Sequence, residues 1–353
     1  MHLINLKKLA TFLLYHHISP NSSLALEPSP HQKKMSNFDA HTHLGISINP
    51  DGTVTRLFNS PTTAANPEPL PGTPTVSKDV TIDANKQTWV RILRPVKLPS
   101  NDNTVARLPI LIYFHSGGFV FQNPDDFATN RKCVQIAADI PSIVVSVGFR
   151  RAPEHRLPTQ YHDARDAVLW INSQLTDPNG EKWLKDYGDF SRSYLYGCGC
   201  GANIAFNAAI KLADDNLEPL RICGVVMNQP MFGGEKRAGS ELKYATDQTL
   251  PLPVLDLMWR LALPEETDRD HRYCNPMVKG PHQDGVKKLG RVLVIGYGGD
   301  IMVDRQQEFV TMLAKCGVQV EARFDQVGFH NIDMVDPARA AAAVNIVKDF
   351  ILG

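Results

Sequence analysis

The stretch YLYGCGCGANIAF, residues 194–206, has the pattern of a strand that passes through a tight turn into a helix. Residues 194–196 are apolar or aromatic, as in a buried strand, and the residues from Ala202 onward are small or apolar, as in a packed helix. A turn of this kind at the end of a parallel strand presents a reactive side chain at the edge of the sheet. The residue at the predicted turn is Gly199, which has no side chain to present.

Apolar runs and helical segments alternate on both sides of this stretch. The predicted strands are 109–114, 142–147, 194–196, 222–227, 292–295 and 319–324, and the predicted helices are 125–138, 161–175, 202–213, 305–315 and 337–351. Continuous apolar strands that alternate with helices indicate a parallel sheet covered on both faces. Two earlier β-rich runs, 76–82 and 88–93, predict a hairpin, so the expected fold is a doubly wound α/β sheet with an antiparallel start.

Residues 231–288 interrupt this alternation and contain no strand run. They include LPLPVLDLMWRLALP, residues 250–264, which predicts an apolar helix. Ligands bind at the carboxyl ends of the strands in open α/β sheets, and an insertion at this point can cover them. We therefore expect a helical cap formed by the N-terminal segment 36–58 and the insertion 231–288.

Charge and cysteine content restrict the partners and the compartment. Lys plus Arg and Asp plus Glu each number 37, so the net charge is zero and no basic stripe indicates binding to nucleic acid or to an acidic membrane. The six cysteines have neither the spacing of a disulfide framework nor the paired spacing of a zinc site. We expect a cytoplasmic protein that binds a small molecule and needs no metal or other cofactor. The sequence does not indicate an oligomeric state.

The first 34 residues differ in character from the rest. Their apolar run, residues 9–15, is far shorter than the roughly 18–20 residues that span a bilayer, and it lacks the cleavage pattern of a signal peptide. We expect residues 1–34 to be a disordered extension and residues 35–353 to form one globular domain.

A second motif follows the strand at 109–114. In YFHSGGFVF, residues 113–121, Gly117 and Gly118 lack Cβ atoms, so their backbone N–H groups can face a pocket and bind an oxyanion. The alternative is an ordinary glycine-rich turn. Taken by itself, this motif does not distinguish an oxyanion-binding loop from an ordinary turn.

Several motifs together resemble the plant carboxylesterases of the hormone-sensitive-lipase type, which have the α/β-hydrolase fold. The family's HGGG corresponds to HSGG at 115–118, with Ser116 in place of the first glycine. The block FRRAPEHRLPTQYHD at 149–163 and the stretch DHRYCNPM at 270–277 also match, and the resemblance runs from about Ser36 to Leu352.

The resemblance implies roles for individual residues. Asp300 in GGDIMVDR corresponds to the acid of the family's triad, and His330 in VGFHNI corresponds to its histidine. Gly199 occupies the nucleophile's position, and the backbone N–H groups of Gly117, Gly118 and Cys200 would form the oxyanion hole. The alternatives are a helix N-cap for Asp300 and an exposed loop position for His330.

The absent serine leaves three hypotheses about function. A cysteine nucleophile at Cys198 or Cys200 fits the turn poorly, because either choice shifts the motif's register.

Loss of the serine from a triad enzyme can lower turnover by about six orders of magnitude. We therefore expect acid–base chemistry such as elimination or cyclisation, as in the family's isoflavanone dehydratase and alkaloid cyclases. The alternatives are weak ester hydrolysis by water that His330 activates, and a catalytically silent binding protein like the gibberellin receptors, although those lose the histidine that this chain keeps.

Overall fold

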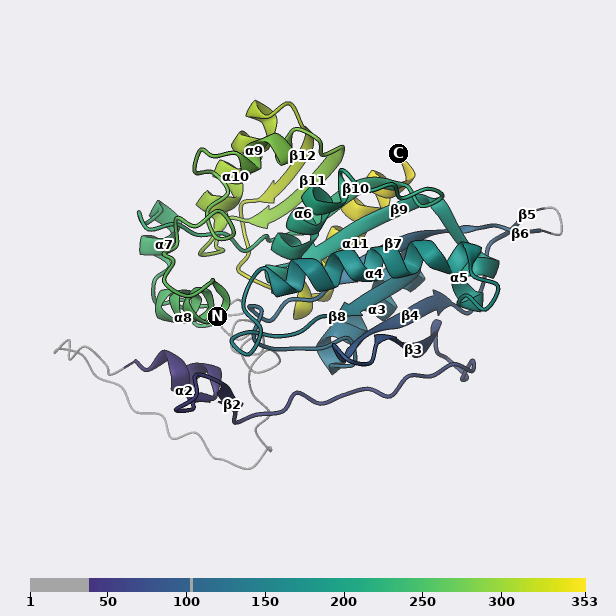
Figure 1. The fold of residues 1–353 in the computed structure, drawn as a ribbon, viewed down its shortest axis with the longest axis horizontal. Coiled ribbons are helices and arrows are strands. Elements are labelled where there is room, and N and C mark those ends of the chain that lie inside the picture. The colour runs from purple at the N-terminus through teal and green to yellow at the C-terminus, as the bar shows by residue number, and fades with distance from the viewer. Residues whose placement is uncertain (1–37, 102–103) are drawn as a thin grey trace.

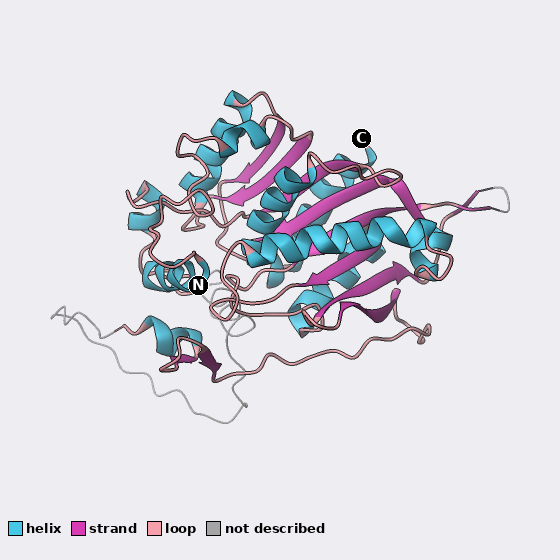
Figure 2. Ribbon diagram, viewed as in Figure 1, coloured by secondary structure: helices cyan, strands magenta, loops and turns pink. Residues whose placement is uncertain are grey.

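A computed structural model describes residues 38–101 and 104–353. Its centre is an eight-stranded sheet with the order β12-β11-β10-β9-β7-β8-β4-β3 (Figures 1 and 2). The strands are β3 (Thr75–Asp83), β4 (Thr88–Pro95), β7 (Leu108–Phe114), β8 (Ile143–Gly148), β9 (Gly188–Cys198), β10 (Ile222–Asn228), β11 (Arg291–Tyr297) and β12 (Gln319–Asp325). The pairs β3–β4 and β4–β8 are antiparallel and the other pairs are parallel. The predicted doubly wound sheet with an antiparallel start is confirmed.

Helices cover both faces of this sheet. They are α3 (Phe127–Asp139), α4 (Thr159–Thr176), α5 (Lys182–Tyr187), α6 (Cys200–Leu212), α10 (Val303–Lys315) and α11 (Pro337–Leu352). Side chains of α4, α6 and α10 pack in one core, and those of α3 and α11 pack in the core on the opposite face. Along β7, Ile110 and Ile112 belong to the first core while Leu111 and Tyr113 belong to the second. This alternation explains why the strand is apolar throughout.

The strand β9 is longer than the predicted 194–196. Its first residues pair with Leu108 and Pro109 of β7, and its register shifts before Ser193. Ser191 is exposed and Arg192 is half-buried in this part, so it lacks the apolar run from which the other strands were predicted. The helix α5 and the short pair β5 (Ser100–Asn101) and β6 (Thr104–Val105) were not predicted either.

The N-terminal segment packs against the insertion. It contains α2 (Ala40–Leu44), β1 (Ile46–Ile48) and β2 (Val54–Arg56), and the insertion contains α7 (Gly239–Lys243), α8 (Leu252–Ala262) and α9 (His282–Val286). Helix α2 lies beside α8 (Figure 1). The Arg56 side chain donates hydrogen bonds to the backbone oxygens of Val120 and Ala152, both at 2.9 Å. These contacts join the N-terminal segment to the loops at the carboxyl ends of the strands.

The predicted extension 1–34 lies outside the described residues. None of the helices within residues 38–101 and 104–353 is long and apolar enough to span a bilayer.

Candidate active site

The turn between β9 and α6 is built by three alternate glycines. Gly199 has φ 55° and ψ −119°, a backbone conformation that residues with a Cβ atom adopt only under strain. A Cβ on Gly197 would lie 2.1 Å from the Gly201 oxygen, and a Cβ on Gly201 would lie 2.0 Å from the Phe114 oxygen. The two outer glycines are therefore required by close backbone packing. The Gly199 N–H donates to the Asn228 oxygen at 3.0 Å, which holds the turn against the end of β10.

Position 199 differs from Gly197 and Gly201 because it has room for a Cβ atom. A Cβ on Gly199 would lie 3.5 Å from the Ser116 Cβ and 3.7 Å from Nε2 of His330. These are ordinary van der Waals distances. The space beside Gly199 is thus bounded by Ser116 on one side and by the His330 imidazole on the other.

His330 and Asp300 form a buried hydrogen-bonded pair. The distance from His330 Nδ1 to Asp300 Oδ2 is 3.0 Å, and the residues are 7% and 0% exposed. Because a carboxylate only accepts, Nδ1 carries the proton and a neutral imidazole has its lone pair on Nε2, the atom nearest Gly199. His330 is therefore not an exposed loop residue. The N-cap of α10 is Met302, so the N-cap reading of Asp300 is wrong as well, although Asp300 Oδ1 accepts from the Met302 N–H at 2.9 Å.

The pair shifts the titration of both groups. Burial of the imidazole lowers the pKa of His330, but the charge of Asp300 and its hydrogen bond raise it by more, so the net pKa is above the ordinary 6.5. Burial raises the pKa of Asp300, but the attraction of His330 and hydrogen bonds from the Met302 N–H and the Gln306 side chain outweigh this, and the net pKa is lowered. Asp300 is therefore ionised at neutral pH and favours a protonated His330.

Gln229 is a site residue that the sequence did not reveal. Its Nε2 donates to Asp300 Oδ2 at 3.0 Å and to the Phe329 oxygen at 3.1 Å, while its Oε1 accepts from the Asn331 N–H at 3.0 Å. Gln229 thereby connects the acid to the backbone on both sides of His330. The available signal was its place directly after β10, at the carboxyl edge of the sheet.

The loop 115–121, here called the glycine loop, faces the same space. Gly117 has φ 107° and Gly118 has φ 61°. A Cβ on Gly117 would lie 2.5 Å from the Phe121 oxygen, and one on Gly118 would lie 2.3 Å from the Met258 sulfur of α8. Among the described backbone–backbone hydrogen bonds of turns, loops and caps, none uses the N–H of Gly117, Gly118 or Cys200. The Gly118 N–H forms a hydrogen bond with the Cys200 thiol, which a ligand oxygen would replace.

The two cysteines of the turn are not exposed thiols. Cys200 is 1% exposed, and its Sγ accepts from the Phe119 N–H at 3.2 Å. Burial raises the pKa of this thiol to about 12, so a thiolate does not form at neutral pH. Burial also raises the pKa of Cys198, which lies 3.5 Å from the Asn228 side chain. The cysteine-nucleophile alternative therefore has no support in the geometry.

The other quoted motifs meet beneath the turn at Asn203. Its Oδ1 accepts from the Tyr161 hydroxyl at 2.7 Å, and its Nδ2 donates to the Tyr273 oxygen at 2.8 Å. Nearby, Arg150 and Asp163 form an ion pair at 2.7 Å. The blocks 149–163 and 270–277 therefore buttress the first turn of α6.

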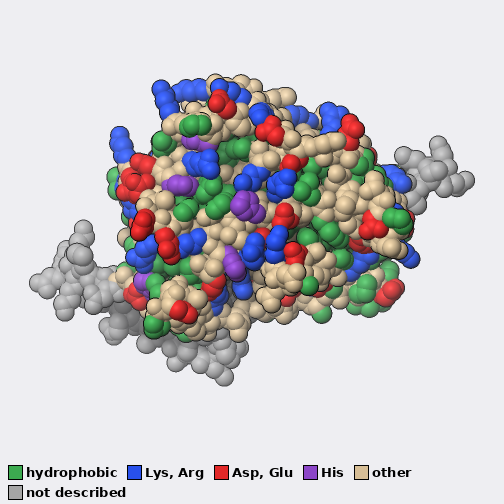
Figure 3. Space-filling model, viewed as in Figure 1, with side chains coloured by type: hydrophobic (Ala, Val, Ile, Leu, Met, Phe, Trp, Pro, Cys, Tyr) green, Lys and Arg blue, Asp and Glu red, His purple; other side chains and the backbone are tan. Residues whose placement is uncertain are grey.

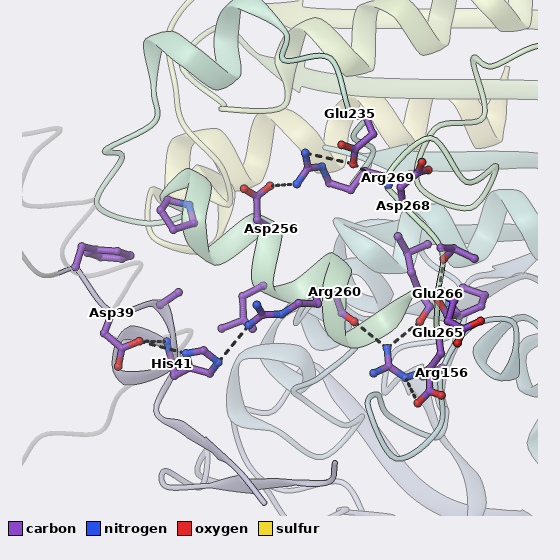
Figure 4. A pocket seen from close by; sticks show the side chains of 17 residues that line it. Asp39, His41, Arg156, Glu235, Asp256, Arg260, Glu265, Glu266, Asp268 and Arg269 are labelled. Atoms are coloured by element: carbon purple, nitrogen blue, oxygen red, sulfur yellow. Dashed lines mark hydrogen bonds and ion pairs between the residues drawn. The ribbon is translucent and has the colours of Figure 1, made fainter. Parts of the chain in front are cut away.

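A surface pocket of about 680 Å³ lies elsewhere, between α2, the Pro253/Asp256/Arg260 face of α8 and the loop 263–269 (Figure 4). Its lining is strongly charged and includes Arg156, Arg260 and Arg269. Figure 3 shows acidic and basic side chains interspersed over one whole face of the molecule. Neither Gly199 nor His330 lines this pocket, so it lies apart from the Asp300–His330 pair.

The sheet order, the turn after β9 and the acid–histidine pair after β11 and β12 define an α/β-hydrolase. A family model described as alpha/beta hydrolase fold matches residues 111–334. The Probable carboxylesterase 9 of Arabidopsis thaliana is 53% identical over 89% of this chain and 97% of its own length. The chain therefore belongs to the plant carboxylesterase family.

Two further comparisons are informative. A 2-hydroxyisoflavanone dehydratase of Glycyrrhiza echinata is 34% identical over 74% of this chain and 78% of its own length. Among solved structures, an esterase of Pyrobaculum calidifontis has a TM-score of 0.65 at 23% identity and covers 78% of this chain and 84% of its own. The latter shows a shared fold. The family thus includes proteins named for ester cleavage and proteins named for dehydration.

Proposed function

We propose that this protein performs acid–base chemistry on a plant small molecule, by elimination or ring closure, without a covalent intermediate. The supporting observation is that His330 Nε2 faces the empty side-chain position of Gly199 at 3.7 Å from a Cβ placed there. A base with space in front of it can reach a C–H bond of the substrate instead of a serine hydroxyl.

Each residue has a defined part in the proposed reaction. The carbonyl oxygen of the substrate accepts hydrogen bonds from the N–H groups of Gly117, Gly118 and Cys200. His330 Nε2 takes a proton from the carbon next to the carbonyl, and the C–H electrons form an enolate. The enolate electrons then expel the leaving group from the β-carbon, or attack an electrophilic carbon to close a ring. In elimination, His330 returns its proton to the leaving group. In ring closure, it returns the proton to the heteroatom that receives the electron pair displaced from the attacked carbon. Either step restores the neutral imidazole.

The environment of His330 suits this role. Asp300 holds the imidazole in the tautomer with Nε2 free and stabilises the imidazolium that forms. Gln229 and Gln306 each donate to the same carboxylate oxygen at 3.0 Å, so the carboxylate cannot rotate freely. The dehydratase relatives support elimination as a chemistry compatible with this fold.

Ester hydrolysis is the second candidate. A water molecule beside Gly199 would lie between His330 Nε2 and the carbonyl carbon of a bound ester, and Ser116 bounds the same space. His330 would then deprotonate this water, the oxygen would attack the carbonyl carbon, and the alcohol would leave with the proton from His330. The relatives named as carboxylesterases favour keeping this candidate.

Two probe substrates separate the candidates. We would assay the purified protein with 2-hydroxyisoflavanone for elimination and with p-nitrophenyl acetate for hydrolysis, beside His330→Gln. His162→Gln, at an exposed position on α4, is the matched control. Elimination lost in His330→Gln and kept in His162→Gln would support the proposal. Turnover that survives His330→Gln, or saturable binding of the probe without any turnover, would contradict it.

A further inference from the structure

A second buried ion pair lies behind His330. Nζ of Lys132, on α3, is 2.7 Å from Oδ2 of Asp333, in the 3-10 helix η1 (Ile332–Met334). Lys132 is 6% exposed and Asp333 is 4% exposed. Asn228 Nδ2 donates to the same Asp333 oxygen at 2.9 Å. Two charges are rarely buried in this way without a specific reason, because their desolvation costs several kcal/mol per ion.

This ion pair is joined directly to the candidate active site. Asp333 follows His330 by three residues, so it belongs to the same loop. Asn228 also lies 3.5 Å from Cys198 Sγ, and its backbone oxygen accepts the Gly199 N–H at 3.0 Å. The Lys132–Asp333 pair therefore fixes the His330 loop to α3 and, through Asn228, to the turn at Gly199.

The ion pair has little room for water around it. A cavity of about 10 Å³ is bordered by Ser116, Cys198, Asn331 and the pair itself. That volume holds about one water molecule. Electrostatic interactions in such a poorly solvated region act over longer distances than they do at the surface.

The charged groups that act on His330 most strongly are carboxylates. The carboxylates of Asp300, Asp333 and Asp247 each raise the pKa of His330, with Asp300 the strongest of the three. The histidine and the thiols on the neighbouring elements are neutral at pH 7. Burial lowers the pKa of His115 to about 4, and burial raises the pKa of Cys198 and Cys200 on the turn.

The tyrosines nearby are neutral as well. Burial raises the pKa of Tyr113 on β7, Tyr196 on β9 and Tyr297 on β11. Arg151 acts on His115, and its pKa is lowered by burial but stays in the range where it is charged. Lys132 is thus the cation that opposes Asp333 directly.

We propose that Lys132 is a positioning residue that neutralises Asp333 and thereby keeps His330 available as a neutral base. This inference rests on the proposed function, in which His330 must accept a proton. Without Lys132, the buried charge of Asp333 would be uncompensated and would act with that of Asp300 to favour the protonated imidazole, which cannot accept a proton. Without Asp333, the charge of Lys132 would instead disfavour protonation.

The two halves of the pair therefore have opposite electrostatic effects, and this gives a direct test. Histidine labelled with ¹³C at Cε1 allows the His330 imidazole to be titrated by NMR, with His330→Gln to assign its signal. Lys132→Met should raise the His330 pKa by about one pH unit, and Asp333→Asn should lower it by about one unit. The double variant Lys132→Met/Asp333→Asn should return it to within a few tenths of the original value.

Controls address folding and structure. Lys132→Arg keeps the charge and should leave the pKa unchanged. Lys86→Met removes a lysine paired with Asp166 at 2.7 Å, outside this cluster, and should also leave it unchanged. Loss of one partner of a buried pair can prevent folding. Asp333→Asn is nearly isosteric, so if Lys132→Met does not fold, the sign of the shift in Asp333→Asn decides.

The outcomes separate this inference from the proposed function, since the titration needs no substrate. Shifts of the same sign in both single variants, or an unchanged or raised pKa in Asp333→Asn, would overturn the role of Lys132. Opposite shifts would support it. If the shifts are opposite but turnover of 2-hydroxyisoflavanone does not depend on His330, the proposed function fails while the electrostatic role of Lys132 stands.

Discussion

Gly199 and His330 lie so close that a Cβ on Gly199 would be in van der Waals contact with the His330 imidazole. A Cβ on Gly199 would lie 3.7 Å from Nε2 and 3.9 Å from Cε1 of His330, with no contact closer than 3.5 Å. The other glycines of the turn have backbone atoms about 2 Å from the corresponding position, at 2.1 Å for Gly197 and 2.0 Å for Gly201. The glycine at 199 is therefore the one in this turn that packing does not require.

The substitution Gly199→Ser should introduce ester hydrolysis. Its hydroxyl would lie within reach of His330 Nε2, and the positive φ of 55° should cost about 1–3 kcal/mol of stability. We expect kcat/KM for p-nitrophenyl acetate to rise by at least about 10²-fold over the unmodified protein. Gly199→Ala has the same strain and no hydroxyl, so it should show the stability loss alone. Equal activity in the two variants would contradict a nucleophile position at 199.

Cys200→Ala should have little effect on any turnover. The thiol of Cys200 is buried, its pKa is raised to about 12 by burial, and its Sγ accepts the Phe119 N–H. Loss of this acceptor should destabilise the fold by about 1–2 kcal/mol, measured by urea unfolding. Iodoacetamide should not label Cys200 in the folded protein. Rapid labelling accompanied by loss of turnover would restore the cysteine-nucleophile alternative.

The fold was predictable where each strand has its own apolar signal. Strands β7 and β8 match their predicted ranges within one residue because both of their faces are buried. The first half of β9 was missed because its pairing with Leu108 and Pro109, and not its own sequence, makes it a strand. Helix α6 begins two residues before its predicted start because the turn at Gly199 ends sooner than the apolar pattern begins.

The candidate site was predictable only in the residues that carry a motif. Asp300 and His330 were named from their local patterns, and the structure places them 3.0 Å apart. Gln229 reaches Asp300 across 71 residues, and Lys132 reaches Asp333 across 201 residues. No local pattern marks such partners, because their interactions exist only once the sheet is assembled. The electrostatic surroundings of the base were therefore beyond sequence reasoning.

Activity that depends on His330 as a base should rise with pH. The pKa of His330 is raised above 6.5 by Asp300, so turnover should increase as pH rises through a value above 6.5 and then level off. Asp300→Asn should move the rising part of the pH–rate profile to lower pH. It should also reduce the plateau rate by about 10⁴-fold, because the His330 tautomer with the proton on Nδ1 is no longer held. A pH–rate profile of 2-hydroxyisoflavanone turnover checks both. An acid limb that does not move in Asp300→Asn would contradict the assignment.

The same pair should make stability depend on pH. Because the pKa of His330 is raised on folding, its contribution is fully present below the ordinary value of 6.5 and is lost as pH rises through the folded value. Because the pKa of Asp300 is lowered, its contribution is present above 3.8 and is lost as pH falls through its folded value. The pair should thus stabilise the fold most between about pH 4 and 6.5. Urea unfolding of the unmodified protein and His330→Gln should differ more at pH 5.5 than at pH 9, and a larger difference at pH 9 would refute the assignment.

Ser116 should be coupled to position 199. Its Cβ lies 3.5 Å from a Cβ on Gly199, and its Oγ lies 3.3 Å from Gln122 Oε1. In Gly199→Ser the two serine side chains would lie next to each other, so Ser116→Gly should leave the new hydroxyl freer to meet His330. We expect Ser116→Gly/Gly199→Ser to hydrolyse p-nitrophenyl acetate about tenfold faster than Gly199→Ser, a coupling of about 1.4 kcal/mol between contacting residues. Ser116→Gly alone is the matched control and should not hydrolyse the ester faster than the unmodified protein. Additive effects of the two substitutions would show that the residues act independently.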